Sequence, residues 1–263
     1  MSLFEISTLF ISGFGAGVIT GLIGASAVTF MAGILMVLLG YSAYDSIGIS
    51  LMTDVFASLV SAHIYRRAKN LDLKRGILIG LFATVFAFIG SLIARLIPDL
   101  ALGDGLGLIT LITGIAFLRN PLKRQDTWLF NYFKNKKTLA SILIGVFVGL
   151  FCGMFGVGGG VNILIALVFI LGFPIKIAVG TSVLIMAFIS LSGGIGHFIN
   201  REFPIFAVVV ASLGAIIGAI VSARYANKNT EETMFKIAGV ILILISFAVV
   251  FKKFFHMMGF SFF

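Results

Sequence analysis

The chain has 263 residues, of which 60% are hydrophobic and only 11% are charged, and its mean hydropathy is +1.16. Soluble domains carry about 25% charged residues and about 45–50% apolar ones, so this composition excludes a soluble globular domain. The net charge of +9 is carried between apolar runs, which favours topology signals over nucleic-acid binding. The single cysteine, Cys152, excludes an intrachain disulfide and a CxxC metal site.

Long uncharged runs predict an all-α, multi-pass integral membrane protein, because several of them approach the roughly 20 residues that cross a hydrocarbon core. We expect about eight transmembrane helices plus two short segments that are re-entrant or broken. The predicted helical segments are 5–24, 26–40, 45–65, 76–97, 102–119, 138–156, 158–172, 176–198, 204–225 and 234–251. Met1–Gly15 has no basic region or cleavage signature of a signal peptide, so we interpret it as part of a retained first span.

A shift of 132 residues aligns the two parts of the chain without a gap. Glycines at four-residue spacing coincide: Gly13, Gly17, Gly21 and Gly24 align with Gly145, Gly149, Gly153 and Gly156. We therefore predict two homologous halves, 1–120 and 138–263, joined by a basic cytoplasmic linker at 121–137. The glycine spacing is also typical of close helix packing in lipid.

The segments Ala25–Gly40 and Val157–Gly172 are too short to cross the bilayer, since 16 residues make about 24 Å of helix. Short, glycine-interrupted segments at corresponding places in two halves indicate a transport site. A helix broken within the membrane exposes N–H groups that need a partner, which a ligand or a water-lined cavity provides.

Basic clusters at 66–75 and 119–137 are expected to be cytoplasmic, and Asp99 and Asp104 then belong to an outside loop. If the short segments do not cross, the protein has eight spans, parallel halves and both termini inside. If they cross, it has ten spans and inverted halves. The loops of the second half barely discriminate between the two arrangements, and we favour eight spans.

The run Gly156-Val157-Gly158-Gly159-Gly160, followed by Asn162, is the sharpest motif. Consecutive glycines accept positive φ, so their N–H groups can converge on an anion at the start of a helix. A flexible turn or tight packing explains the same run equally well. The first half has lost these glycines, but Ser26 and Thr29 remain as hydroxyl donors.

Polar residues inside the predicted spans are further candidates. Thr181 and Ser182, with Ser50 in the first half, are potential substrate ligands or local backbone caps. Asp54 lies on one helix face with Ser50 and Ser58, at four-residue spacing. It predicts proton or cation coupling, because a carboxylate in the membrane is costly. The alternative is a structural carboxylate paired with His63 or Arg66.

The sequence predicts no cofactor, metal or catalytic residue. His63 and His197 have no carboxylate or cysteine cluster nearby, and both are interpreted as helix-end histidines at the membrane interface. No Walker, HExxH or GxSxG motif is present, which disfavours ATP-driven transport within this chain and the common hydrolases.

The second-half motifs resemble the TauE/SafE, or sulfite-exporter, family. The similar segments are Gly149–Gly160, Leu171–Pro174 and Ala178–Ser182, with a weaker copy at Gly17–Gly24 and Ser46–Ser50 and a glycine-rich span ending at Arg224. The resemblance implies a secondary transporter of sulfur-containing or organic anions, with a substrate site at Gly158, Gly159, Gly160, Thr181 and Ser182. The chain departs from the family pattern in lacking the proline that often follows the triple glycine and the first-half triple glycine.

The sequence thus predicts a small-anion transporter in the inner or plasma membrane that works by alternating access, and the family resemblance implies sulfite, sulfonates or similar anions as its substrates. The expected partners are the anion, the bilayer and a coupling H⁺ or Na⁺, with a homo-oligomer left open and no nucleic acid. An anion channel is the alternative, and an intramembrane enzyme is disfavoured because Cys152, His63 and His197 are scattered.

Overall fold

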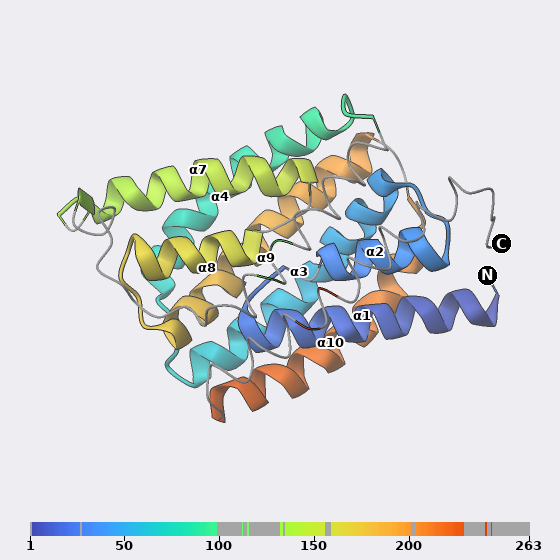
Figure 1. The fold of residues 1–263 in the computed structure, drawn as a ribbon, viewed down its shortest axis with the longest axis horizontal. Helices are drawn as coiled ribbons and strands as arrows, with labels where there is room; N and C mark the ends of the chain where they lie inside the picture. The colour runs from blue at the N-terminus through green and yellow to red at the C-terminus, as the bar shows by residue number, and fades with distance from the viewer. Residues whose placement is uncertain are drawn as a thin grey trace.

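The computed structural model of the protein is a bundle of α-helices (Figure 1). It describes residues 2–26, 28–98, 112, 115, 132–133, 135–155, 159–200, 203–228, 240 and 243. Within these ranges the regular structure is helical throughout, as the composition predicted. The predicted spans 102–119 and 234–251, most of the linker 121–137, and Asp99 and Asp104 lie outside the described residues.

The described helices match the predicted segments closely. The bounds are α1 Leu3–Ile23, α2 Val28–Leu38, α3 Ala43–Arg67, α4 Leu73–Ala94, α7 Lys137–Phe155, α8 Gly159–Phe169, α9 Ile175–Asn200 and α10 Ile205–Lys228. Six of these helices, all except α2 and α8, are long and apolar enough to cross a membrane. The helices α2 and α8 have 11 residues each, about 16 Å of helix, so the two segments predicted to be short are short.

Local sequence explains where these helices begin and end. The side chains of Ser2, Ser42 and Asp72 each accept a hydrogen bond from a backbone N–H in the first turn of the helix that follows, as N-cap residues do. Gly24 closes α1 with φ of 62°, a left-handed conformation that glycine adopts without strain. Its N–H still donates to the carbonyl of Thr20, so α1 ends inside the bundle with a capped terminus.

The two ends of the bundle differ in charge. At one end α3 finishes and α4 begins, and Asn70 between them donates a 2.7 Å hydrogen bond to Asn227 near the end of α10. We call this the basic end, because it holds every described Lys and Arg side chain except Arg95. These residues are Arg66, Arg67, Lys69, Lys74, Arg75, Lys136, Lys137, Lys176, Arg224 and Lys228.

The opposite end holds the start of α1 and the turn between α2 and α3. The Tyr41 hydroxyl donates a 3.0 Å hydrogen bond to the Glu5 carboxylate, and burial together with this bond raises the pKa of Tyr41 to about 12. Since Tyr41 follows α2 and Glu5 begins α1, α2 returns to the end from which α1 started.

The closest helix pairs join the two parts of the chain. α1 packs along α10 and α7 packs along α4, each pair running parallel. At the contacts a Cβ on the glycine would overlap the facing backbone, so glycine is what allows this approach. On α1 and α10 the pairs are Gly13 with Ala211, Gly17 with Ala215, and Gly21 with Ala219; on α7 and α4 they are Gly145 with Ile79, Gly149 with Ala83, and Gly153 with Ala87. Every residue of the first set differs by 132 from its counterpart in the second.

The aligned helices α1 and α7 point in opposite directions. α4 begins at the basic end and α7 runs parallel to it, whereas α1 runs parallel to α10, which finishes there. The segment after α8 also returns to the basic end, where the Arg75 guanidinium lies 5.2 Å from the centre of the Phe173 ring. The sequence favoured parallel halves; the described helices are instead antiparallel, because each short helix folds back along the helix that precedes it.

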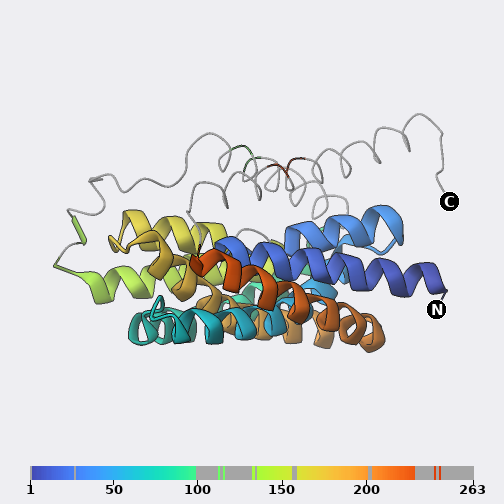
Figure 2. The same ribbon diagram turned by 90° about the horizontal axis from the view of Figure 1, so that it is seen from below.

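The short helices lie together on one face of the bundle. Figure 2 shows α2 and α8 on the face opposite α4. In Figure 1 the two short helices start near the centre and run toward opposite ends. The first residues of both short helices therefore lie near the centre of the bundle (Figure 1).

Candidate functional site

A buried carboxylate lies at the middle of α3. Asp54 is 2% exposed, and its Oδ1 accepts a 2.9 Å hydrogen bond from the Thr20 hydroxyl of α1. Its Oδ2 accepts from the Ser190 hydroxyl of α9 at 3.0 Å and from the Ser26 hydroxyl at 3.5 Å. Hydroxyl donors from three parts of the chain thus converge on one carboxylate, and such bonds to a charged acceptor are strong.

The structure does not show the alternative pairing of Asp54 with His63 or Arg66. Both of these side chains are exposed, while Asp54 is enclosed among α1, α9 and the turn before α2. His63 and Arg66 follow Asp54 by about 2.5 and 3.3 turns of α3, which is roughly 13 and 18 Å along the helix axis. His63 and Arg66 therefore lie too far along α3 to pair with Asp54.

The two short helices begin beside this carboxylate. Ser26 accepts a 3.3 Å hydrogen bond from the N–H of Val28 and so caps α2. Gly160, in the first turn of α8, packs so tightly on the backbone of Gly24, Ala25 and Ser26 that a Cβ would overlap it. The N-termini of α2 and α8, whose N–H groups carry partial positive charge, therefore meet next to Asp54.

The predicted glycine motif is only partly described. Gly156 and Gly158 lie outside the described residues, while Gly159 begins α8 and Gly160 is buried in the contact above. Asn162 is exposed, and Thr29 lies in the first turn of α2.

Thr181 and Ser182 of α9 are both engaged by the protein. The Thr181 hydroxyl accepts a 3.0 Å hydrogen bond from the N–H of Asp72. The Ser182 hydroxyl donates to the carbonyl of Gly24 at 2.9 Å, and it lies 2.8 Å from the carbonyl of Val179. These bonds hold α9 against the start of α4 and against the turn that follows α1.

A stripe of buried hydroxyls follows the Asp54 side of α3. The five hydroxyl residues of this stripe lie within about 140° of one another around the helix axis, at 100° per residue. None of these hydroxyls has a hydrogen-bond partner in the part of the chain that the structure describes; they belong to Ser46, Ser50, Thr53, Ser58 and Ser61. Because buried polar groups normally have partners, this stripe is a place for water or a polar solute.

Sequence reasoning named Ser50, Ser58 and Asp54 as one face but missed Thr20 and Ser190. Both are hydroxyl residues within apolar spans, which is a weak signal because such residues often bond their own backbone. Only the packing of α1 and α9 against α3 brings their hydroxyls to Asp54.

His197 differs from the interfacial histidine that the sequence predicted. It is fully buried, its Nε2 lies 3.1 Å from the Gly153 carbonyl, and its ring centre lies 4.4 Å from that of Tyr44. In the first half, the Tyr65 hydroxyl donates to the Gly21 carbonyl at 3.0 Å. Residues 65 and 197, and residues 21 and 153, each differ by 132, so two different side chains make corresponding contacts.

These features define a class of protein. Long apolar helices, two short helices that meet inside the bundle and a buried carboxylate at their N-termini are typical of a multi-pass membrane transporter. In the described residues no group of three or more His, Cys, Asp or Glu is placed to hold a metal ion.

Comparison with known proteins gives the family. The model of the family "Sulfite exporter TauE/SafE" matches residues 9–249, and the chain belongs to this family. Similar proteins are the probable membrane transporter proteins YdhB and YunE of Bacillus subtilis and MJ0441 of Methanocaldococcus jannaschii. YdhB is 29% identical over 80% of this chain and 86% of its own length. The corresponding values are 23%, 80% and 82% for YunE, and 26%, 84% and 83% for MJ0441. No solved structure matches the chain.

Proposed function

We propose that this membrane transporter moves small sulfur-containing or organic anions, such as sulfite or sulfonates, across the cytoplasmic membrane by alternating access. The observation that carries the proposal is the meeting of two helix N-termini beside Asp54 and its hydroxyl donors. Backbone N–H groups at the start of a helix and neighbouring hydroxyls suit oxyanion oxygens, because helix N-termini favour negative charge.

The substrate binds, in this proposal, between the start of α8 and the turn before α2. Gly159 and Gly160 contribute backbone N–H groups of the first turn of α8, and Gly156 and Gly158 belong to the same motif. Asn162, Thr29 and Ser50 supply further polar groups from the neighbouring turns. Thr181 and Ser182 have a positioning role, since their hydroxyls already bond to the backbone of Asp72 and Gly24.

Asp54 couples substrate binding to a proton. An ionised carboxylate occupies the Thr20, Ser26 and Ser190 hydroxyls and repels an arriving anion. Protonation of Asp54 removes the repulsion and releases the hydroxyls for substrate oxygens. Anion and proton binding then favour one another, which is the thermodynamic condition for symport.

The proposed path of the substrate through the protein runs along α3. The buried hydroxyls of Ser46, Ser50 and Thr53, which have no hydrogen-bond partner among the described residues, lie on one side of Asp54 along the helix. Those of Ser58 and Ser61, which also lack one there, lie on the other. They provide water-like partners for a polar solute in both directions. This continuity supports entry from either side of the membrane in turn.

In this proposal, two inverted halves, 1–120 and 138–263, allow the site to open to each side of the membrane in turn. The 132-residue shift that relates the glycine contacts of α1 and α10 to those of α7 and α4 supports this symmetry. Exchange of the roles of two such halves opens the shared site to opposite sides. The charge asymmetry supports a cytoplasmic basic end, which puts the start of α1 outside.

A liposome experiment tests the proposal. The purified protein is reconstituted and screened for uptake of sulfite, thiosulfate and sulfonates under imposed pH and sodium gradients. We expect saturable uptake of one anion class, and the substitution Gly159→Leu to abolish it while leaving folded protein in the membrane. Ile165→Phe, which adds bulk at an exposed position of the same helix, is the control. Unchanged flux in Gly159→Leu removes the start of α8 from the site.

A further inference from the structure

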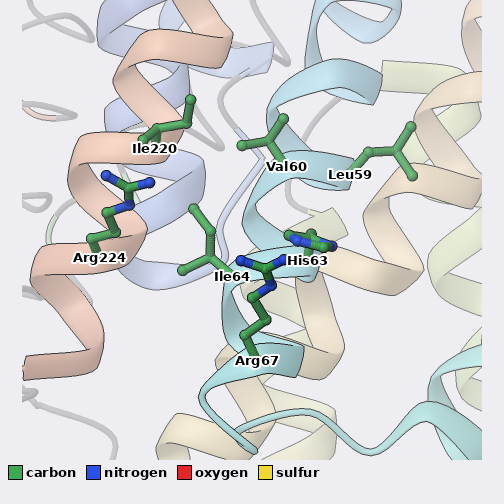
Figure 3. A pocket seen from close by; sticks show the side chains of 7 residues that line it. All are labelled: Leu59, Val60, His63, Ile64, Arg67, Ile220 and Arg224. Carbon is green, nitrogen blue, oxygen red and sulfur yellow. The ribbon is translucent and has the colours of Figure 1, made fainter.

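A pocket of about 460 Å³ lies between α3 and α10 near the basic end, away from the Asp54 site. Its described lining is apolar except for two arginines and one histidine: Leu59, Val60, His63, Ile64, Arg67, Ile220 and Arg224. Figure 3 shows Arg67 and Arg224 reaching from different helices on either side of Ile64, with His63 above Arg67. The pocket therefore combines an apolar floor with cationic groups at one end.

Both guanidinium groups are available to a ligand. Neither Arg67 nor Arg224 is hydrogen-bonded or ion-paired to a residue of the described ranges, and the pocket lining contains no carboxylate. Two guanidiniums and an imidazole that share one pocket fit a phosphate diester, because guanidinium groups bind phosphate oxygens in pairs.

The pocket does not belong to the transport path. On α3 its residues are centred roughly 110° around the helix from the hydroxyl stripe that contains Asp54. They are continuous with exposed apolar side chains of both helices, including Phe56 on α3 and Ile217 and Val221 on α10. A ligand in the pocket thus has an anionic group at the basic end and an apolar part along the outer surface.

We propose that this pocket binds an anionic glycerophospholipid of the cytoplasmic leaflet, with its phosphate between Arg67 and Arg224 and an acyl chain along α3 and α10. The position of the arginines supports this occupant: Arg67 is the last residue of α3, and Arg224 lies one turn before the end of α10. Basic pockets between helices on the cytoplasmic side are where acidic headgroups bind. A free inorganic anion has no apolar part to pack against this lining, whereas an acyl chain does.

The test measures lipid binding to the full-length, delipidated protein by native mass spectrometry. We expect phosphatidylglycerol to bind roughly tenfold more tightly than phosphatidylcholine, and Arg67→Gln with Arg224→Gln to weaken phosphatidylglycerol binding roughly 10- to 30-fold. Lys74→Gln with Lys228→Gln removes the same charge at the same end outside the pocket and should retain binding. Ile220→Trp fills the apolar floor and should weaken binding without changing charge.

Several outcomes overturn the proposal. Equal loss in the two double variants shows a general charge effect, and displacement of the lipid by excess inorganic phosphate shows a site for free anions. If the arginine double variant does not fold, Ile220→Trp and the single variant Arg224→Gln decide: wild-type lipid binding in both overturns the proposal. Anion transport is not measured, so failure of the proposed transport function leaves this result unaffected.

Discussion

Asp54 is the residue around which the candidate site is arranged. A carboxylate within a membrane span is expensive unless it has strong partners, and Thr20, Ser26 and Ser190 provide three hydroxyls. The same hydroxyls are the donors that a small oxyanion needs. Competition between the carboxylate and the substrate for one set of donors is the physical basis of the coupling proposed here.

Asp54→Asn separates coupling from binding. The amide has nearly the shape of the carboxyl group but neither ionises nor repels an anion, so we expect uptake driven by a pH gradient to fall at least about tenfold. Exchange of external for internal substrate at equal pH, which needs no net proton movement, should persist.

Glu5→Gln removes a carboxylate at the opposite end of the bundle from the basic residues and serves as the control in the same assay. An Asp54→Asn protein that still responds to the pH gradient contradicts the coupling role. Loss of exchange as well assigns Asp54 to substrate binding alone.

Helices touch most closely where glycine meets backbone. In α7, Gly149 lies against the backbone of Ala83 in α4, and Gly17 of α1 lies in the same way against Ala215 of α10. Lipid gives helices little hydrophobic reason to associate, so such contacts provide van der Waals packing that larger residues forbid. The glycine spacing in the sequence predicted this packing, but not which helix would be the partner.

Gly149→Leu should destabilise the protein, because the new side chain overlaps the backbone of α4, which has no flexible end to move aside. Overpacking commonly costs about 1–3 kcal/mol, which corresponds to roughly 2–10 °C in thermal unfolding of a protein of this size. The measurement is thermal unfolding in detergent.

Phe147→Leu in the same helix is the matched control, since Phe147 is 61% exposed. It should unfold within about 1 °C of the unaltered protein, because surface changes rarely matter. If Gly149→Leu unfolds at the same temperature as this control, the α4–α7 contact is not as close as described.

The whole molecule is polarised by charge. Its described basic side chains gather at the end where α3 and α10 finish, with Arg95 as the exception. Cytoplasmic loops carry an excess of Lys and Arg, so the arrangement of the described helices supports the proposed orientation, which the loops of the second half, taken alone, barely indicated. In that orientation the first residue of α1 and the last of α10 lie on opposite sides of the membrane.

Cysteine labelling tests this orientation. The only native cysteine, Cys152, is buried, so single introduced cysteines report cleanly. Leu3→Cys, at a position 83% exposed, should react with a membrane-impermeant maleimide in intact cells. Lys228→Cys should react only after the membrane is permeabilised.

The reverse pattern would place the basic end outside, and equal labelling of both positions in intact cells would put the two helix ends on the same side. Either result contradicts the proposed orientation. Unlabelled Cys152 in the otherwise unaltered protein is the background control.

The sequence alone determined the membrane setting, the helix bounds and the two short segments, because hydropathy, capping residues and segment length act locally. It also singled out Asp54, since an isolated carboxylate in an apolar run is visible without a fold. Tertiary structure decided the rest. Packing of α1 and α9 on α3 selected Thr20 and Ser190 as the partners of Asp54, buried His197, and turned α2 and α8 back along α1 and α7. These outcomes depend on contacts between residues more than 30 positions apart in the chain, and no local pattern encodes which distant helix will fill a given face.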